Sequence, residues 1–133
     1  MLLIATLSPI SYYLKGDTKI INRINEEVKD GNIVIPPIVY FEIKKLLLKN
    51  KSKSKLAAFE ILLSKYGVET ISKEILDISL FIFLNLQLNG IVIDDADIII
   101  AGYCIQNGYT LITNNMKHFE HIKNLKIENW LLC

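Results

Sequence analysis

Three carboxylates stand within four residues at Asp94, Asp95 and Asp97, directly before an apolar helical pattern. Negative charges this close together repel one another unless a cation or the positive end of a helix lies nearby. A helix that begins here gives Asp94 the role of an N-cap and gives Asp95 or Asp97 a favourable place in the first turn. Asp97 also has Ile100 and Ala101 as one-turn neighbours, which places it towards the buried side. A buried carboxylate needs a partner, and a hard divalent ion such as Mg²⁺ or Mn²⁺ can serve several oxygens at once.

Glu42 is the second acidic candidate, and it lies in a helical pattern in which Val39 and Ile43 share one face. This spacing places Glu42 on or near the inward side of the helix. The alternative is an exposed glutamate that pairs with Lys45 or Lys49. The residues themselves leave both interpretations open.

Thr113, Asn114 and Asn115 follow an apolar run, and their hydroxyl and amide oxygens can bind a metal or position a water molecule. The same residue types form simple turns, so that interpretation stays open as well. His118 and His121 are three residues apart, but no Cys or Glu completes a zinc set. We therefore expect both histidines to be ordinary surface residues.

Lysine is concentrated in one region, which contains Lys44, Lys45, Lys49, Lys51, Lys53 and Lys55. Such a region is usually a solvated face, but it can also meet phosphates or an acidic partner. The whole chain has 15 Lys and Arg against 14 Asp and Glu, which gives a formal charge of +1. Nucleic-acid binding must therefore come from a local patch, because the molecule as a whole has no field that attracts it.

Short apolar runs alternate along the chain with helical patterns, and these elements must position the polar residues. We expect strands at residues 2–7, 32–35, 68–71, 109–113 and 126–130, with a further short strand just before Asp94. Helices are expected near residues 9–15, 18–28, 38–48, 55–65, 73–88 and 96–106. This alternation predicts a parallel sheet covered by helices on both faces. The carboxyl edge of that sheet should collect the segments that follow strands, at residues 7–8, 36–42, 94–97 and 113–115.

The length of 133 residues is typical of one core, and we interpret residues 1–133 as a single domain. Hydrophobic residues make up 51% of the chain, which excludes long disorder. The first 14 residues lack the basic start of a secretory signal, and the apolar stretch 78–93 is too short and too interrupted to span a membrane. Cys104 and Cys133 fit no disulfide or zinc pattern. We expect a soluble cytoplasmic protein without a membrane partner.

The helix expected at residues 73–88 is apolar nearly all round. One small core cannot cover such a helix on every side. The pattern therefore predicts a dimer interface or a partner surface along it.

The order and spacing of these segments resemble the PIN domain family, in particular the VapC-type toxins of toxin–antitoxin pairs. Residues 10–17 resemble the first helix of these proteins, residues 39–43 resemble the second acidic site, and residues 94–101 resemble the third. The closing segment of the family resembles residues 111–115, 118–119 and 125–130. The resemblance covers nearly the whole chain.

The resemblance implies a three-layer α/β sandwich, in which helices flank a mostly parallel sheet of four to five strands. It also implies a Mg²⁺- or Mn²⁺-dependent endoribonuclease that hydrolyses phosphodiester bonds in RNA, with a small antitoxin protein as partner and a homodimer as its assembly. Glu42, Asp95 and Asp97 would bind the metal. Glu42 and Asp97 would act in catalysis together with Asn115, which stands where many members carry a final aspartate. The RNA would contact a set of polar and basic residues: Ser8, Thr113, Lys44 and Lys45.

The chain departs from the family at its first acidic position. The first strand of the family normally ends in Asp, but this position falls on Thr6, or on Ala5 after a shift of one residue, and no acidic residue precedes Asp17. The loss of a charged ligand predicts weaker metal binding, by about 1–3 kcal/mol. Two functions therefore stay open: a VapC-type ribonuclease impaired at this position, and a non-catalytic PIN module that keeps its dimer and partner surfaces. A third, more distant interpretation is a plain α/β binding domain whose acidic residues only cap helices.

Overall fold

A computed structural model of the chain describes residues 3–5, 7–29, 33–64 and 70–130, with the backbone alone for residues 3–5, 7–9, 11, 28 and 29. The strands are β1 (Leu3–Ala5), β2 (Ile33–Val34), β3 (Thr110–Ile112) and β4 (Lys126–Glu128). The helices are α1 (Leu7–Leu14), α2 (Thr18–Lys29), α3 (Pro37–Lys49), α4 (Lys53–Leu63), α5 (Lys73–Leu88), α6 (Asp95–Asn107) and α7 (Met116–Phe119).

The four strands form one sheet in the order β2-β1-β3-β4, and every neighbouring pair is parallel. Ala5 at the end of β1 lies opposite Ile112 in β3, and Ile112 lies opposite Glu128 in β4. The carboxyl ends of these three strands therefore lie at the same edge of the sheet. The predicted α/β fold with a parallel, helix-flanked sheet is confirmed.

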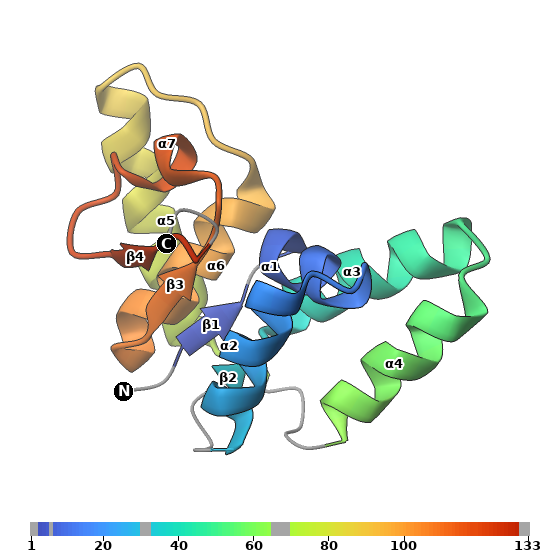
Figure 1. Cartoon of the computed structure of the whole chain (residues 1–133). Helices are drawn as coiled ribbons and strands as arrows, with labels where there is room; N and C mark the ends of the chain where they lie inside the picture. Colours follow the sequence, from blue (N-terminus) through green and yellow to red (C-terminus); the bar gives the residue numbers. More distant parts are fainter. Residues whose placement is uncertain (1–2, 6, 30–32, 65–69, 131–133) are drawn as a thin grey trace.

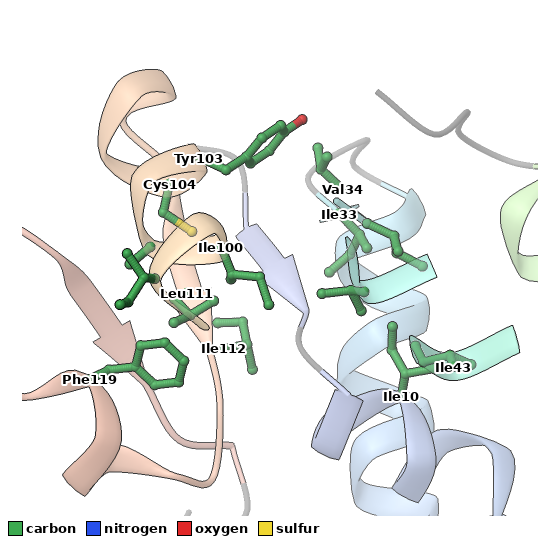
Figure 2. Close-up of a cluster of buried hydrophobic side chains, with 14 of the residues drawn as sticks. Ile10, Ile33, Val34, Ile43, Ile100, Tyr103, Cys104, Leu111, Ile112 and Phe119 are labelled. Atoms are coloured by element: carbon green, nitrogen blue, oxygen red, sulfur yellow. The ribbon is translucent and has the colours of Figure 1, made fainter. Parts of the chain in front are cut away.

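The helices gather in two groups around this sheet. α5 and α6 lie together beside β3 and β4, whereas α1 to α3 lie on the side of β1 and β2, and α4 packs outside them against α3 (Figure 1). The two groups share one apolar core, in which β1 passes between Ile100 and Tyr103 of α6 and the two residues of β2 (Figure 2). Leu111 and Ile112 of β3 are fully buried within it. Removal of these side chains from water is the main force that holds the two groups together.

Two helix ends follow the signals in the sequence. Ser72 begins α5 as its N-cap, and its Oγ accepts a hydrogen bond from the Ile75 amide at 3.3 Å. Gly108 ends α6 in the left-handed conformation at φ 69°, which glycine adopts without the steric cost of a Cβ atom. Both ends agree with the helices expected near residues 73–88 and 96–106.

α5 and α6 pack closely because one glycine lets their backbones approach. A Cβ atom at Gly102 of α6 would overlap Oγ of Ser79 in α5, and it would lie 3.1 Å from the Ile75 carbonyl oxygen. The Ser79 hydroxyl donates a hydrogen bond to that same oxygen at 2.7 Å. The beginning of α6, with its aspartates, is therefore held by a tight helix pair.

Three details of the predicted elements are wrong. Residues 91–93 form no strand, because they pass directly from α5 to α6 and leave Val92 94% exposed. Thr70 and Ile71 are also outside any strand, and the rest of that predicted strand lies outside the described residues. The expected helices also omit α7, which begins directly after Asn115 and buries Phe119.

The outer surface of α5 is apolar and uncovered, as expected for a helix that is apolar nearly all round. Phe81 is 73% exposed, and Leu80 is 60% exposed. Further exposed side chains continue the surface along the helix: Leu76, Phe83, Leu84 and Leu88. No helix in the described part of the chain is long and apolar enough to cross a membrane.

Candidate functional site

α3 presents Glu42 at the border of the core. Pro36 is the N-cap residue and Pro37 begins the helix, where the missing amide proton of proline costs no hydrogen bond. Val39 and Ile43 on the inward side are 0% and 2% exposed, and Glu42 beside them is half-buried. The prediction that Glu42 lies near the inward side of its helix is confirmed.

The first turn of α6 presents the aspartates. Asp94 is the N-cap residue, and its backbone oxygen accepts the Ile98 amide at 3.1 Å. The expected N-cap position of Asp94 is therefore confirmed, although its side chain makes no capping hydrogen bond. Asp97, three residues later, has a side chain that is 24% exposed.

The structure brings Glu42 and Asp97 together, from two helices that pack against each other. Burial raises the pKa of Glu42 above its ordinary value, the negative charge of Asp97 raises it further, the Lys45 ammonium lowers it, and Asp94 raises it again. Burial is also the largest cause that raises the pKa of Asp97. The site therefore concentrates negative charge in a partly desolvated place, where a cation would be attracted.

His118 of α7 also belongs to this site, although the sequence predicted an ordinary surface histidine. Its Nδ1 lies 3.1 Å from Oδ2 of Asp97, and both the hydrogen bond and the charge of the imidazole lower the pKa of that carboxyl. The signal that could have located His118 is its position beside Phe119, whose burial draws the short helix inward.

Asp95 does not join the other carboxylates. It borders a hollow of about 390 Å³ between α5 and α6, together with Leu80, Phe83 and Ile98. The charges that raise the pKa of Glu42 come from Asp97 and Asp94, and Asp95 is not among them. The helix explains the difference, because consecutive residues are turned by about 100° around its axis.

Thr113 and Asn115, which follow β3, form hydrogen bonds with residues close to them in the sequence. The Thr113 side chain is buried, and its Oγ1 accepts a hydrogen bond from the Asn115 amide at 3.0 Å. Asn115 is exposed, and its backbone oxygen accepts the His118 amide at 3.2 Å. The predicted roles of both residues stay predictions. Ser8 lies in α1, and its side chain, like the whole of Thr6, lies outside the described residues.

The two predicted RNA-binding lysines of α3 have different surroundings. Lys44 donates a hydrogen bond to the Tyr40 hydroxyl at 2.9 Å and pairs with Glu60 of α4 at 3.1 Å. Lys45 is exposed, and its charge acts on Glu42. The structure therefore places Lys45 beside the acidic site and uses Lys44 to connect α3 with α4.

The donor atoms of the site suit a hard divalent cation that keeps much of its water. Within the described ranges, no group of three or more His, Cys, Asp or Glu side chains is arranged to enclose a metal ion. Mg²⁺ usually binds through one or two carboxylates and retains water for the other positions. Glu42 and Asp97 can provide those two carboxylates, with Asp94 close enough to add its charge.

Comparison with known proteins agrees with this arrangement. Residues 8–125 match the family described as PIN domain. The chain is 31% identical over 123 residues to "Ribonuclease VapC2" of Rickettsia felis, which covers 92% of this chain and 86% of that protein. It is 32% identical over 98 residues to "Ribonuclease VapC1" of Methanocaldococcus jannaschii, covering 74% and 70% of the two chains.

The fold agrees as well. The crystal structure of VapBC2 from Rickettsia felis bound to a DNA fragment from their promoter contains a chain that superposes with a TM-score of 0.89. The two chains are 27% identical, and the match covers 98% of this chain and 99% of the other. This chain therefore belongs to the PIN domain family, and within it to the VapC type.

Proposed function

We propose that this protein is a metal-dependent endoribonuclease of VapC type, the toxin of a toxin–antitoxin pair. The observation that carries the proposal is the meeting of Glu42 and Asp97, from separate helices, in one partly buried acidic site. Similarity to two proteins named as VapC ribonucleases supports the reaction class. Mg²⁺ or Mn²⁺ is the proposed cofactor, because carboxylate oxygens are its preferred ligands.

Each residue of the site then has a chemical task. Glu42 and Asp97 would hold the cation, which when bound polarises a phosphate and lowers the pKa of a bound water molecule. The carboxylates orient that water for attack in line with the bond that breaks. Asp94 adds negative charge that favours the cation, and Lys45 can contact a neighbouring phosphate of the RNA.

Cleavage of a labelled single-stranded RNA in Mg²⁺, Mn²⁺ or EDTA tests the proposal. Cleavage should require the cation, and Glu42→Gln should reduce kcat by about 100-fold or more. Glu60→Gln is the matched control, because Glu60 is an exposed glutamate that pairs with Lys44 on the side facing α4. Cleavage that persists in EDTA, or that survives Glu42→Gln, would contradict the proposal.

A non-catalytic PIN module is the second candidate, and the missing acidic residue at the end of β1 favours it. Ala5 lies opposite Ile112, so the end of β1 is adjacent to the residue that precedes Thr113. A carboxylate there would be near the same sheet edge as the acidic site. Thr6→Asp and Ala5→Asp distinguish the candidates in the RNA assay. Cleavage that appears only in one of these variants would favour the module, and cleavage by the natural chain would exclude it.

We also propose that the protein forms a homodimer through the outer surface of α5. A second copy would cover Leu80, Phe81 and Phe83, whose exposure costs free energy in water. Sedimentation velocity on the natural chain tests this proposal. A concentration-dependent dimer is expected, and a monomer at all concentrations up to the millimolar range would contradict it.

The proposed protein partner is a small antitoxin with a basic segment. The acidic site can receive an Arg side chain, which pairs with carboxylates through two parallel hydrogen bonds. Such a segment would compete with a divalent cation, because both need the charge of Glu42 and Asp97. A synthetic peptide with one Arg should therefore bind less tightly in Mn²⁺ than in EDTA, and equal binding would contradict the proposed location.

A further inference from the structure

His118 joins two segments that are 21 residues apart in the sequence. Its Nδ1 lies 3.1 Å from Oδ2 of Asp97, and no other hydrogen bond of that carboxylate is found among the described residues. The contact engages one carboxylate oxygen and restricts rotation of the group. The Oδ1 atom then has a defined direction relative to the rest of the site.

The imidazole is itself held in place by α7. Phe119 is 3% exposed, and its ring meets the His118 ring edge-on at a centroid distance of 6.4 Å. The His118 amide donates to the Asn115 oxygen, and the Asn115 amide donates to Thr113 Oγ1. A chain of contacts therefore connects the end of β3 with the carboxylate of Asp97.

His121 in the same segment has none of these features. Its Nε2 lies 3.6 Å from Oε1 of Glu120, the adjacent residue, and both side chains are about half exposed. The two histidines thus have the same chemistry and similar exposure, but only His118 reaches the acidic site.

We propose that His118 is a positioning residue, which fixes the Asp97 carboxylate through the Nδ1–Oδ2 hydrogen bond so that Asp97 and Glu42 bind one divalent cation together. The proposal rests on the proposed function of the site. Groups that orient a metal-binding side chain typically change metal affinity by roughly 10–100-fold when they are removed. The competing interpretation is a tether that only holds α7 against α6.

Three substitutions separate the two interpretations: His118→Ala, His118→Asn and His118→Gln. The amide nitrogen of Asn lies about where Nδ1 lies in His, whereas that of Gln lies about where Nε2 lies. His118→Asn can therefore keep the hydrogen bond to Asp97, and His118→Gln cannot keep it in the same geometry. His121→Ala is the matched control, because it removes the neighbouring histidine without a contact to the site.

Each variant is titrated with MnCl₂, and the midpoint temperature of thermal unfolding is the readout. The midpoint of the same variant in EDTA is the baseline. We expect His118→Ala and His118→Gln to weaken the apparent affinity for Mn²⁺ by roughly 10–100-fold, while His118→Asn and His121→Ala stay within about threefold of the natural chain. The kcat for RNA cleavage should fall with the affinity for Mn²⁺.

Several results would overturn the inference. An unchanged affinity of His118→Ala for Mn²⁺ would show that His118 only holds α7 against α6. This conclusion would stand even if the variant unfolds at a lower temperature in EDTA. Equal Mn²⁺ affinities of His118→Asn and His118→Gln would exclude a role of the hydrogen bond from Nδ1. These two variants decide the question if His118→Ala does not fold.

If the natural chain shows neither a shift of its unfolding midpoint in Mn²⁺ nor cleavage of RNA, the proposed function fails and the inference fails with it. If it shows both, only the His118 variants decide.

Discussion

The first turn of α6 divides two regions with opposite character. On one side, Asp97 meets Glu42 and His118, and negative charge accumulates in a partly buried place. On the other side, Asp95 borders an apolar hollow beside Leu80 and Phe83 of α5. Two carboxylates that are neighbours in the sequence therefore have different surroundings, and their residue type alone does not assign their function.

The difference shows what each side lacks. On the acidic side, the carboxylates of Glu42 and Asp97 lie close together, and this arrangement favours a bound cation. On the apolar side, hydrophobic side chains are exposed to water, and this exposure favours contact with another protein surface. One helix thus connects the proposed chemistry with the proposed assembly.

The largest expected effect is the difference in RNA cleavage between Asp97→Asn and Asp95→Asn. Asp97→Asn should reduce RNA cleavage by about 100-fold or more, because it removes a charge from the acidic side. Asp95→Asn should change the rate by less than about threefold, because that side chain lies on the α5 side of the helix. Initial rates with a labelled RNA measure both, and equal losses would show that the two sides of α6 are not separate.

The next effect concerns the packing of α6 on α5. Gly102→Ala should lower the free energy of unfolding by about 1–3 kcal/mol, because the new methyl group overlaps Ser79 Oγ. Adding Ser79→Ala should restore part of the loss, since it removes the nearest atom but leaves the Ile75 carbonyl oxygen in contact. Urea unfolding compares the two variants with the natural chain. A fully tolerated Gly102→Ala would contradict the close helix approach.

A smaller effect is expected for the apolar surface of α5. Leu80→Lys should weaken self-association by roughly tenfold or more, because it places a charge in the proposed dimer interface. Ile61→Lys is the control, since Ile61 of α4 is 64% exposed and lies away from α5. Analytical ultracentrifugation compares them, and equal weakening in both variants would place the interface elsewhere.

The smallest effect is a pH dependence of stability without metal. The pKa of Glu42 and that of Asp97 are raised from ordinary values of 4.5 and 3.8, so the folded state binds these protons more tightly than the unfolded state does. Their stabilising contribution is therefore present at low pH and is lost as the pH rises from those ordinary values through the raised ones. Asp97→Asn removes one of these groups.

In EDTA, Asp97→Asn should thus gain stability relative to the natural chain as the pH rises above 3.8, the ordinary pKa of the aspartate. Urea unfolding at several pH values measures the gain, with Asp95→Asn as the control. A gain that shrinks as the pH rises would contradict the raised pKa of Asp97.

The sequence predicted the sheet and the meeting of Glu42 with Asp97 because both follow from local patterns. Alternating apolar runs specify parallel strands and helices, and the spacing around Glu42 places it beside buried residues. The separation of Asp95 from Asp97 depends on the angle at which α6 packs against its neighbours. A linear pattern does not contain that angle.

The apolar Phe119 indicates that this segment turns inward, but the contact of His118 with Asp97 itself could not be predicted, for a related reason. It depends on a short helix after β3, and the sequence there is equally typical of a turn. The same limit applies to Lys44 and Lys45, whose different partners are decided by the position of α4. The choice of partner by each of these side chains was therefore the part of the site that required the structure.

The position of a bound divalent ion tests the central claim most directly. Crystals of the natural chain soaked in MnCl₂ should show an anomalous difference peak between the carboxylates of Glu42 and Asp97, with His118 still in contact with Asp97. A peak confined to other carboxylates, or no peak at a concentration that saturates the thermal shift, would contradict the account.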